Sequence, residues 1–185
     1  MTKLLGISGS LRRGSYNSAL LRAATKLMPP EATLEVASIR GIPLYDYDVE
    51  VQGMPAIVTT LKEAIVAADG VLLVTPEYNN SILGVFKNAI DWLSRPSPDI
   101  KRVFGGRPFA LIGASPGGFG TVLSQAGWLP VLRTLGTQFW SGGRLAVARA
   151  ASVFDESGAL RDAANLNAWL TSVSGIHSAT RLSKG

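Results

Sequence analysis

Residues 71–81 read Val-Leu-Leu-Val-Thr-Pro-Glu-Tyr-Asn-Asn-Ser, and this stretch decides the fold that we expect. Its first four residues are β-branched or aliphatic without interruption, which is typical of a central parallel strand covered on both faces. The polar residues that follow end the strand. A helical stripe comes next, at Ile82, Phe86, Ala89, Ile90 and Leu93, and it ends at Arg95-Pro96. The stretch therefore predicts a strand, a loop and a helix in that order.

The same unit recurs on both sides of this stretch. Strands are expected at residues 3–8, 33–39, 71–74 and 109–113, with a last one between 136 and 148. Helices are expected at residues 17–28, 55–68, 121–135 and 159–173, and after Ser81. Repeated β–α units with short connections force the strands to be parallel. The sequence therefore predicts one α/β domain over residues 1–185: a doubly wound, five-stranded parallel sheet with helices on both faces, and residues 178–185 as a loose tail.

The composition excludes several kinds of site. The chain has no cysteine, which removes thiol chemistry and cysteine metal sites. Its single histidine, His177, makes a Ser-His-Asp triad or a zinc site unexpected, so we expect no metal. No window approaches the roughly 20 unbroken apolar residues of a membrane span, and the apolar stretch near Met1 is too short for a signal peptide. We therefore expect a cytoplasmic protein with no membrane contact.

The positive charge is unevenly distributed. The net charge is +5; residues 1–92 carry 8 Lys or Arg and 9 Asp or Glu, whereas residues 93–185 carry 10 and 4. A nucleic-acid surface normally needs a concentrated basic stripe, and no basic run here is longer than two residues. Diffuse positive charge suits the attraction of a phosphorylated small molecule, so we expect no nucleic-acid partner.

Three unusual loops each follow an expected strand, at residues 9–17, 76–81 and 115–121. In an open parallel sheet, the carboxyl ends of the strands meet at one edge, and ligands bind there where the strand order reverses. We therefore expect these loops, although far apart in the sequence, to form one ligand site.

The first loop has the composition of an anion cradle. Ser10, Ser15 and Asn17 supply short hydrogen-bonding side chains, and Arg12 adds a positive charge. The helix that follows points its positive end at the same place. The same residue types also suit a plain helix-capping loop, with Ser15 or Asn17 as the cap.

The sequence does not match either of two better-known phosphate-binding motifs. Gly9 and Gly14 match the first half of the P-loop G-x-x-x-x-G-K-[ST], but Ser15-Tyr16 replaces its Lys-Ser/Thr pair. Gly118-Phe119-Gly120 does not extend to the dinucleotide fingerprint G-x-G-x-x-G, because Leu123 stands at the last position. We therefore expect neither a nucleoside triphosphatase nor a Rossmann dinucleotide site.

The second loop suits a flat polar ring. Pro76 stiffens the exit from the strand, and Asn79 and Asn80 tolerate unusual backbone angles. Tyr78 offers a planar face with a polar tip. We interpret Glu77 as an anion at the amino end of a helix rather than as an acid–base group.

The third loop combines Ser115 with glycines at 117, 118 and 120. Missing side chains indicate that something lies close against the backbone, and a flexible turn is the alternative. Core or subunit-contact positions are expected for the four tryptophans, Trp92, Trp128, Trp140 and Trp169.

With its loops assembled, the sequence resembles the NAD(P)H-dependent FMN reductase family, in its quinone- and chromate-reductase branch. The resemblance rests on residues 9–17 (Gly-Ser-Leu-Arg-Arg-Gly-Ser-Tyr-Asn), 76–79 (Pro-Glu-Tyr-Asn), 87–94 (Lys-Asn-Ala-Ile-Asp-Trp-Leu-Ser) and 113–115 (Gly-Ala-Ser). It implies a flavodoxin-like fold with strand order 2-1-3-4-5, FMN as the cofactor, and a homodimer or homotetramer. One departure is Asn80, which stands where some relatives carry an aromatic residue.

The resemblance also implies positions for the cofactor. Ser10, Arg12, Ser15 and Asn17 would hold the FMN phosphate, and Glu77, Tyr78 and Asn79 would lie against the ring and ribityl chain. Ser115 would contribute from the third loop. The full set of expected cofactor-binding residues is Ser10, Leu11, Arg12, Ser15, Tyr16, Asn17, Pro76, Glu77, Tyr78, Asn79, Asn80, Ser115, Gly117 and Gly118.

The implied reaction is a two-electron hydride relay from NADPH or NADH, through flavin N5, to quinones or similar small acceptors. The hydride chemistry belongs to the cofactor, so we expect no catalytic side chain. Arg144 or Arg107 is expected to meet a nicotinamide phosphate, and a partner subunit to complete the site. The alternatives are a reductase of free FMN, a flavodoxin-type electron carrier, and a regulatory module without flavin.

Overall fold

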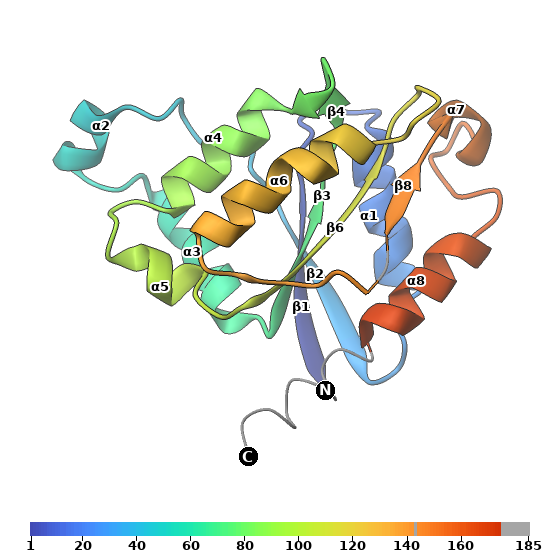
Figure 1. The fold of residues 1–185 in the computed structure, drawn as a ribbon, viewed down its shortest axis with the longest axis horizontal. Helices are drawn as coiled ribbons and strands as arrows, with labels where there is room; N and C mark the ends of the chain where they lie inside the picture. The colour runs from blue at the N-terminus through green and yellow to red at the C-terminus, as the bar shows by residue number, and fades with distance from the viewer. Residues whose placement is uncertain (143, 175–185) are drawn as a thin grey trace.

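The computed structural model describes residues 1–142 and 144–174, and it consists of a central sheet between two helical layers (Figure 1). The strands are β1 (Thr2–Ser8), β2 (Ala32–Ala37), β3 (Gly70–Val74), β4 (Glu77–Tyr78), β5 (Ser81–Ile82), β6 (Pro108–Ala114), β7 (Gln138–Phe139) and β8 (Leu145–Val147). The helices are α1 (Tyr16–Lys26), α2 (Tyr47–Gln52), α3 (Ala56–Ala67), α4 (Gly84–Leu93), α5 (Asp99–Val103), α6 (Val122–Thr134), α7 (Ala150–Val153) and α8 (Ala164–Ser174).

The main sheet is parallel and has the order β2-β1-β3-β6-β7, with β8 also paired to β6. β7 pairs with the start of β6, at Pro108 and Phe109, and β8 pairs with its end, from Ile112 to Ala114. The fifth position of the sheet is thus one strand in two pieces. This confirms the expected doubly wound fold and corrects the strand count, from five to six in the main sheet. The sequence between the pieces, Trp-Ser-Gly-Gly-Arg at 140–144, contains two glycines, which weaken strand structure.

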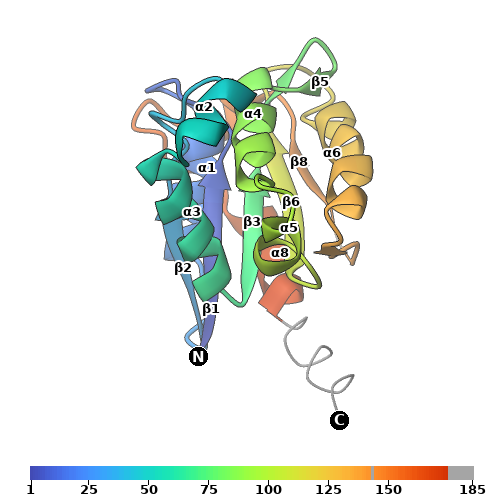
Figure 2. The same ribbon diagram turned by 90° about the vertical axis from the view of Figure 1, so that its left-hand side faces the viewer.

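The central strands β1, β3 and β6 contribute alternate side chains to two separate cores. In β3, Val71 and Leu73 pack with α3, α4, α5 and α6, whereas Leu72 and Val74 pack with α1, α7 and α8. This alternation explains why the run is apolar without interruption, since neither of its faces meets water. Figure 2 shows α3 and α4 in front of the sheet, with α1 behind it. Trp92 and Trp128 are fully buried in the first core, as expected for core tryptophans.

Several short elements of the structure were not predicted from the sequence. Helices α2, α5 and α7 were not expected, nor was the separate two-stranded sheet of β4 and β5. α2 has no buried residue, so no apolar periodicity marks it. His177 and the expected tail at 178–185 lie outside the described residues. In the part of the chain that the structure describes, no helix has both the length and the apolar character to cross a membrane.

Candidate functional site

The three loops predicted to meet do lie at one edge of the sheet. We call them loop 1 (residues 9–15, after β1), loop 2 (residues 75–82, after β3) and loop 3 (residues 115–121, after β6). β1, β3 and β6 are neighbours in the sheet, so the three loops are neighbours too. The N–H of Gly9 donates to the carbonyl of Val74 at 2.9 Å, and that of Thr75 donates to Ile112 at 2.8 Å. In Figure 1 this edge is at the top of the molecule, opposite the N-terminus.

Loop 1 ends in a capped helix that still has donors to offer. Ser15 is the N-cap of α1, and its Oγ accepts from the N–H of Ser18 at 3.3 Å, which confirms the capping role. Within the described chain, the backbone N–H groups of Tyr16 and Asn17 have no acceptor. Capping and anion binding are therefore compatible, because the positive end of α1 keeps two unpaired donors.

Arg12 supplies a positive charge beside these donors. Its side chain is exposed, and its guanidinium carbon lies 5.5 Å from the centre of the Tyr16 ring. Among the described residues, no carboxylate forms an ion pair with it. The cation at loop 1 is thus available to a phosphate.

Asn17 has a structural task that the sequence did not reveal. It is only 4% exposed. Its Nδ2 donates to the carbonyl of Ala114 at 2.9 Å, and its Oδ1 accepts from the N–H of the same residue at 2.9 Å. The side chain therefore fastens the start of α1 to the end of β6. A direct contact between this amide and a phosphate would compete with both bonds, whereas its backbone N–H stays open.

Glu77 acts as the cap of a helix far along the chain. Its Oε2 accepts from the N–H groups of Leu123 at 2.8 Å and Ser124 at 2.9 Å, both in the first turn of α6. The interpretation of Glu77 as an anion at a helix amino end is thereby confirmed. The sequence did not identify the helix, because loop 2 leads into α4 and not into α6. This carboxylate fixes loop 2 to the helix that follows loop 3.

Loop 2 turns back on itself as a hairpin. Asn79 and Asn80 have φ angles of 49° and 58°, the left-handed values that a two-residue type I′ turn requires at both central positions. Both residues therefore adopt the unusual backbone angles that they were expected to tolerate. Tyr78, just before the turn, is 54% exposed, so its ring is accessible at the edge.

Loop 3 is closed by its serine and open at its glycines. Ser115 Oγ donates to the carbonyl of Gly120 at 2.6 Å, so the hydroxyl stabilises its own loop. Within the described residues, the N–H groups of Gly117 and Gly118 have no acceptor. A Cβ at Gly118 would meet no atom within 4 Å, and one at Gly117 only Ser115 Oγ, at 3.6 Å. The loop therefore presents bare backbone donors to open space.

A buried polar cluster beneath loops 2 and 3 was missed by sequence reasoning. Thr75 Oγ1 accepts from Trp128 Nε1 at 2.9 Å and lies 2.9 Å from Ser124 Oγ. All three residues are fully buried. They come from a strand end and from α6, so no local motif joins them. The one feature of the sequence that could have indicated the cluster is the hydroxyl of Thr75, directly after the apolar strand β3.

The two arginines expected near a nicotinamide phosphate lie at opposite edges. Arg107 precedes β6, and its guanidinium donates to the carbonyls of Val103 and Ala68. The expectation for Arg107 is wrong, because the amino ends of the strands face away from the three loops. Arg144 Nη2 donates to the carbonyl of Val122 at 3.0 Å, in the first turn of α6. Its role with a nicotinamide phosphate stays a prediction.

The residues at this edge fit a molecule with an anionic tail and a flat polar ring. Loop 1 and α1 provide unpaired N–H groups beside Arg12, the donor set that a phosphate requires. Loop 3 provides further N–H groups at a place that no side chain fills, and loop 2 provides an exposed aromatic face. FMN has both kinds of group.

The comparisons with known proteins agree with this geometry. A family model described as NADPH-dependent FMN reductase matches residues 2–152. An NAD(P)H-dependent FMN reductase of Pseudomonas aeruginosa is 48% identical over 160 residues, which cover 86% of this chain and 85% of that protein. A quinone reductase of Pseudomonas putida is 37% identical over 156 residues, covering 84% and 83%. The flavoenzyme NAD(P)H:acceptor oxidoreductase FerB from Paracoccus denitrificans has a TM-score of 0.83 at 32% identity, over 93% of this chain and 94% of that one. The chain therefore belongs to the NADPH-dependent FMN reductase family.

Proposed function

We propose that the three-loop edge binds FMN and that the enzyme uses it to pass a hydride from NADPH or NADH to a quinone. The observation that carries the proposal is the arrangement of unpaired donors. The N–H groups at the start of α1 lie beside Arg12, which has no ion-pair partner among the described residues, and those of Gly117 and Gly118 lie at a separate, open loop. Two groups of donors at one edge suit a ligand that is anionic at one end and polar along a ring at the other.

The side chains and backbone groups have separate tasks in this proposal. Arg12 and the N–H groups of Tyr16 and Asn17 hold the phosphate. Tyr78 lies against the ring, and the backbone of Gly117 and Gly118 bonds its polar edge. When bound, FMN supplies the hydride chemistry, while the protein supplies position and electrostatics. The other proposed contacts come from Ser10, Leu11, Ser15, Pro76, Glu77, Asn79, Asn80 and Ser115.

A quinone is the acceptor that we propose. Relatives support it, since the Pseudomonas putida protein described above is named as a quinone reductase. The exposed Tyr78 and the bare glycines of loop 3 would leave one side of a bound ring open to a flat molecule. A flat acceptor stacks on such a surface without help from a charged side chain.

A second copy of the chain is proposed to cover this open side, in a homodimer or homotetramer. Phe119 in loop 3 is 84% exposed, and Leu123 in the first turn of α6 is 46% exposed. Together with Tyr78 they place apolar side chains around the candidate site, and contiguous exposed apolar surface commonly marks a contact between proteins. Light scattering at working concentration tests this, and a fully active monomer would contradict it.

The central test is a flavin spectrum followed through one turnover. The purified protein is desalted, its visible spectrum is recorded, and NADPH or NADH and then 1,4-benzoquinone are added without oxygen. We expect flavin absorbance to survive desalting, to bleach with nicotinamide and to return with quinone. Flavin lost on desalting, with NAD(P)H oxidation restored by added FMN, would indicate FMN as an exchanging substrate. Oxidation of NAD(P)H that does not depend on flavin would contradict the proposal.

A further inference from the structure

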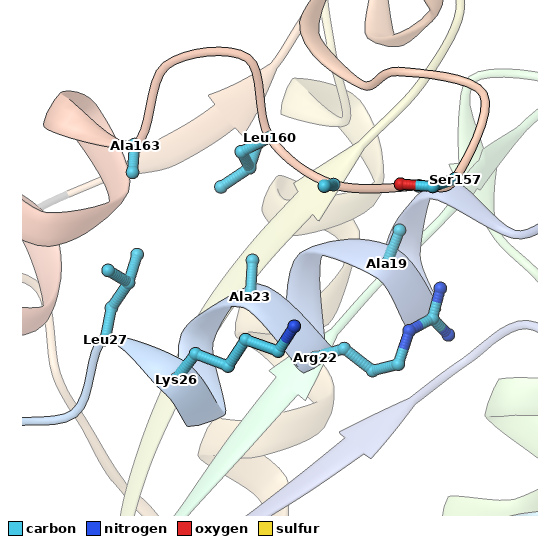
Figure 3. A pocket seen from close by; sticks show the side chains of 10 residues that line it. Ala19, Arg22, Ala23, Lys26, Leu27, Ser157, Leu160 and Ala163 are labelled. Atoms are coloured by element: carbon cyan, nitrogen blue, oxygen red, sulfur yellow. The ribbon is translucent and has the colours of Figure 1, made fainter.

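A pocket of about 290 Å³ lies on the outer face of α1, between this helix and the segment that joins α7 to α8 (Figure 3). Its lining includes Ala19 and Ala23 from the helix and Leu160 from the segment. Two cationic side chains, Arg22 and Lys26, complete the helix side. No residue of the three loops lines it, so it is separate from the candidate flavin site.

The spacing of residues along α1 builds the pocket. Positions 19, 22, 23 and 26 are three and four residues apart and therefore share one helix face. Alanine at 19 and 23 leaves room between the helix and the segment above it. Figure 3 shows these two alanines pointing toward the segment that carries Leu160, with Arg22 and Lys26 beside them on the helix. The pocket thus has apolar walls and a pair of positive charges one turn apart.

Neither positive charge is neutralised by a partner in the part of the chain that the structure describes. Among the residues that the structure describes, no carboxylate forms an ion pair or a side-chain hydrogen bond with Arg22 or Lys26. Asp155, at the start of the opposite segment, uses its Oδ1 to accept hydrogen bonds within its own turn. It accepts from the N–H and Oγ of Ser157, at 2.9 and 2.6 Å, and from the N–H of Ala159 at 2.9 Å. An anion in the pocket would therefore be held by the two cationic side chains.

The segment opposite α1 is held in place before any ligand arrives. Phe154 forms a β-bridge with Leu160, and its ring stacks on that of Tyr16 with the centres 5.7 Å apart. Gly158 has a φ of 79°, and a Cβ there would come within 3.3 Å of Arg22 Nη2. Glycine therefore lets the turn lie close against the guanidinium. A preformed pocket binds its ligand without the entropic cost of ordering a loop.

We infer that this pocket binds a small carboxylate with an apolar body. The carboxylate lies between Arg22 and Lys26, and the apolar body fills the space over Ala19, Ala23 and Leu160. Arginine matches a carboxylate with two parallel N–H groups, and lysine adds a second charge. The site is additional to the proposed flavin function and does not depend on it.

Benzoate is the probe, and benzamide is its neutral counterpart of the same shape. Each is titrated into protein saturated with FMN, so that any anion site at loop 1 is filled, and binding is followed by amide NMR shifts. The variant R22Q/K26Q removes both cations of the pocket. The matched control K101Q/R133Q removes two exposed cations from α5 and α6, with the same change in net charge. Inorganic phosphate serves as an anion without an apolar body.

We expect benzoate to shift the amides of Ala19, Ala23 and residues 157–160 saturably, and benzamide and phosphate to bind more weakly. R22Q/K26Q should weaken benzoate binding at least tenfold, or about 1.4 kcal/mol, and K101Q/R133Q should leave it unchanged. Shifts confined to other residues, equal loss in both double variants, or no saturable binding would overturn the inference. Because the readout is local to the pocket, the same titration can be run on protein without FMN, so failure of FMN to bind would leave this test intact.

Discussion

Glu77 and Ser124 are joined by a hydrogen bond of 2.9 Å from the backbone N–H of Ser124 to Oε2 of Glu77. The same oxygen accepts from Leu123 at 2.8 Å. The hairpin of loop 2 is thus fixed to the amino end of α6, a helix that begins only after the next strand of the sheet. Two of the three loops at the candidate site are therefore held by one carboxylate, and the site depends on α6 staying folded.

Replacing Glu77 tests this link. Glu77→Ala leaves two N–H groups at the start of α6 without their acceptor, so we expect it to lower the free energy of unfolding by about 1–2 kcal/mol. Glu77→Gln keeps an acceptor oxygen and should lose less. Urea unfolding measures both. Glu31→Ala, at an exposed glutamate, is the control, and an equal effect of Glu31→Ala and Glu77→Ala would contradict the capping role.

Asn17 gives a second test of how the edge is assembled. Asn17→Ala leaves the buried N–H and carbonyl of Ala114 without partners, which should lower the free energy of unfolding by about 2–4 kcal/mol. Asn17→Asp has nearly the same shape but places a carboxylate against the Ala114 carbonyl, so it should not rescue stability. Urea unfolding compares them with Asn165→Ala on the exposed face of α8. Full stability of Asn17→Asp would show that the amide donor is unimportant.

Arg12 is expected to hold the anionic tail of FMN. Arg12→Ala removes a charge that no carboxylate of the described chain neutralises, so it should weaken FMN binding more than tenfold, about 1.4 kcal/mol. The loss should shrink as salt concentration rises, because the interaction is electrostatic. Fluorescence titration measures it. Arg133→Ala, on the exposed side of α6, serves as the control, and unchanged affinity of Arg12→Ala would refute the phosphate assignment.

Acid should weaken the ion pair between Lys62 and Asp99, whose side chains are 3% and 29% exposed with a separation of 2.9 Å. The hydrogen bond from Lys62, followed by one from Arg102, holds the pKa of Asp99 below its ordinary value of 3.8. The pKa of Asp99 is lower in the folded protein than in the unfolded chain. The ion pair therefore stabilises the fold fully above pH 3.8, and this stabilisation is lost as the pH falls through the pKa of Asp99 in the folded protein.

Asp99→Asn should therefore lower the free energy of unfolding by about 1–3 kcal/mol at pH 7, since it leaves the buried Lys62 without its ion-pair partner. The difference from the unmodified protein should shrink as the pH falls below 4, the range set by the ordinary pKa of Asp99. Unfolding in urea across this range measures it. Lys62→Met combined with Asp99→Asn should recover part of the loss at pH 7. A difference that is constant with pH would contradict the ion pair.

The sequence predicted the sheet and its ligand edge well, because both depend on local patterns. The run at 71–74 is apolar on both sides and each loop follows a strand, so the positions of the strands and loops come from periodicity, whereas the strand order was an expectation from the family resemblance. The expectation of an FMN-dependent NAD(P)H oxidoreductase is confirmed by the family model and its relatives. The cytoplasmic location, the assembly and the individual cofactor contacts stay predictions.

What the sequence missed is held together by contacts between distant residues. Asn17 and Ala114 lie 97 residues apart, and their paired hydrogen bonds follow from the sheet order rather than from a motif. The β7–β8 edge was expected as one strand between residues 136 and 148, whereas its two short pieces pair with opposite ends of β6. Arg107 was misplaced because its charge was considered without the edge of the sheet on which it lies.

A crystal structure of the protein grown with excess FMN tests the central claim most directly. The account predicts the phosphate at the start of α1 beside Arg12, and the ring between Tyr78 and the backbone of Gly117 and Gly118. Density for FMN at any other place, or a fully ordered three-loop edge with no FMN, would contradict it.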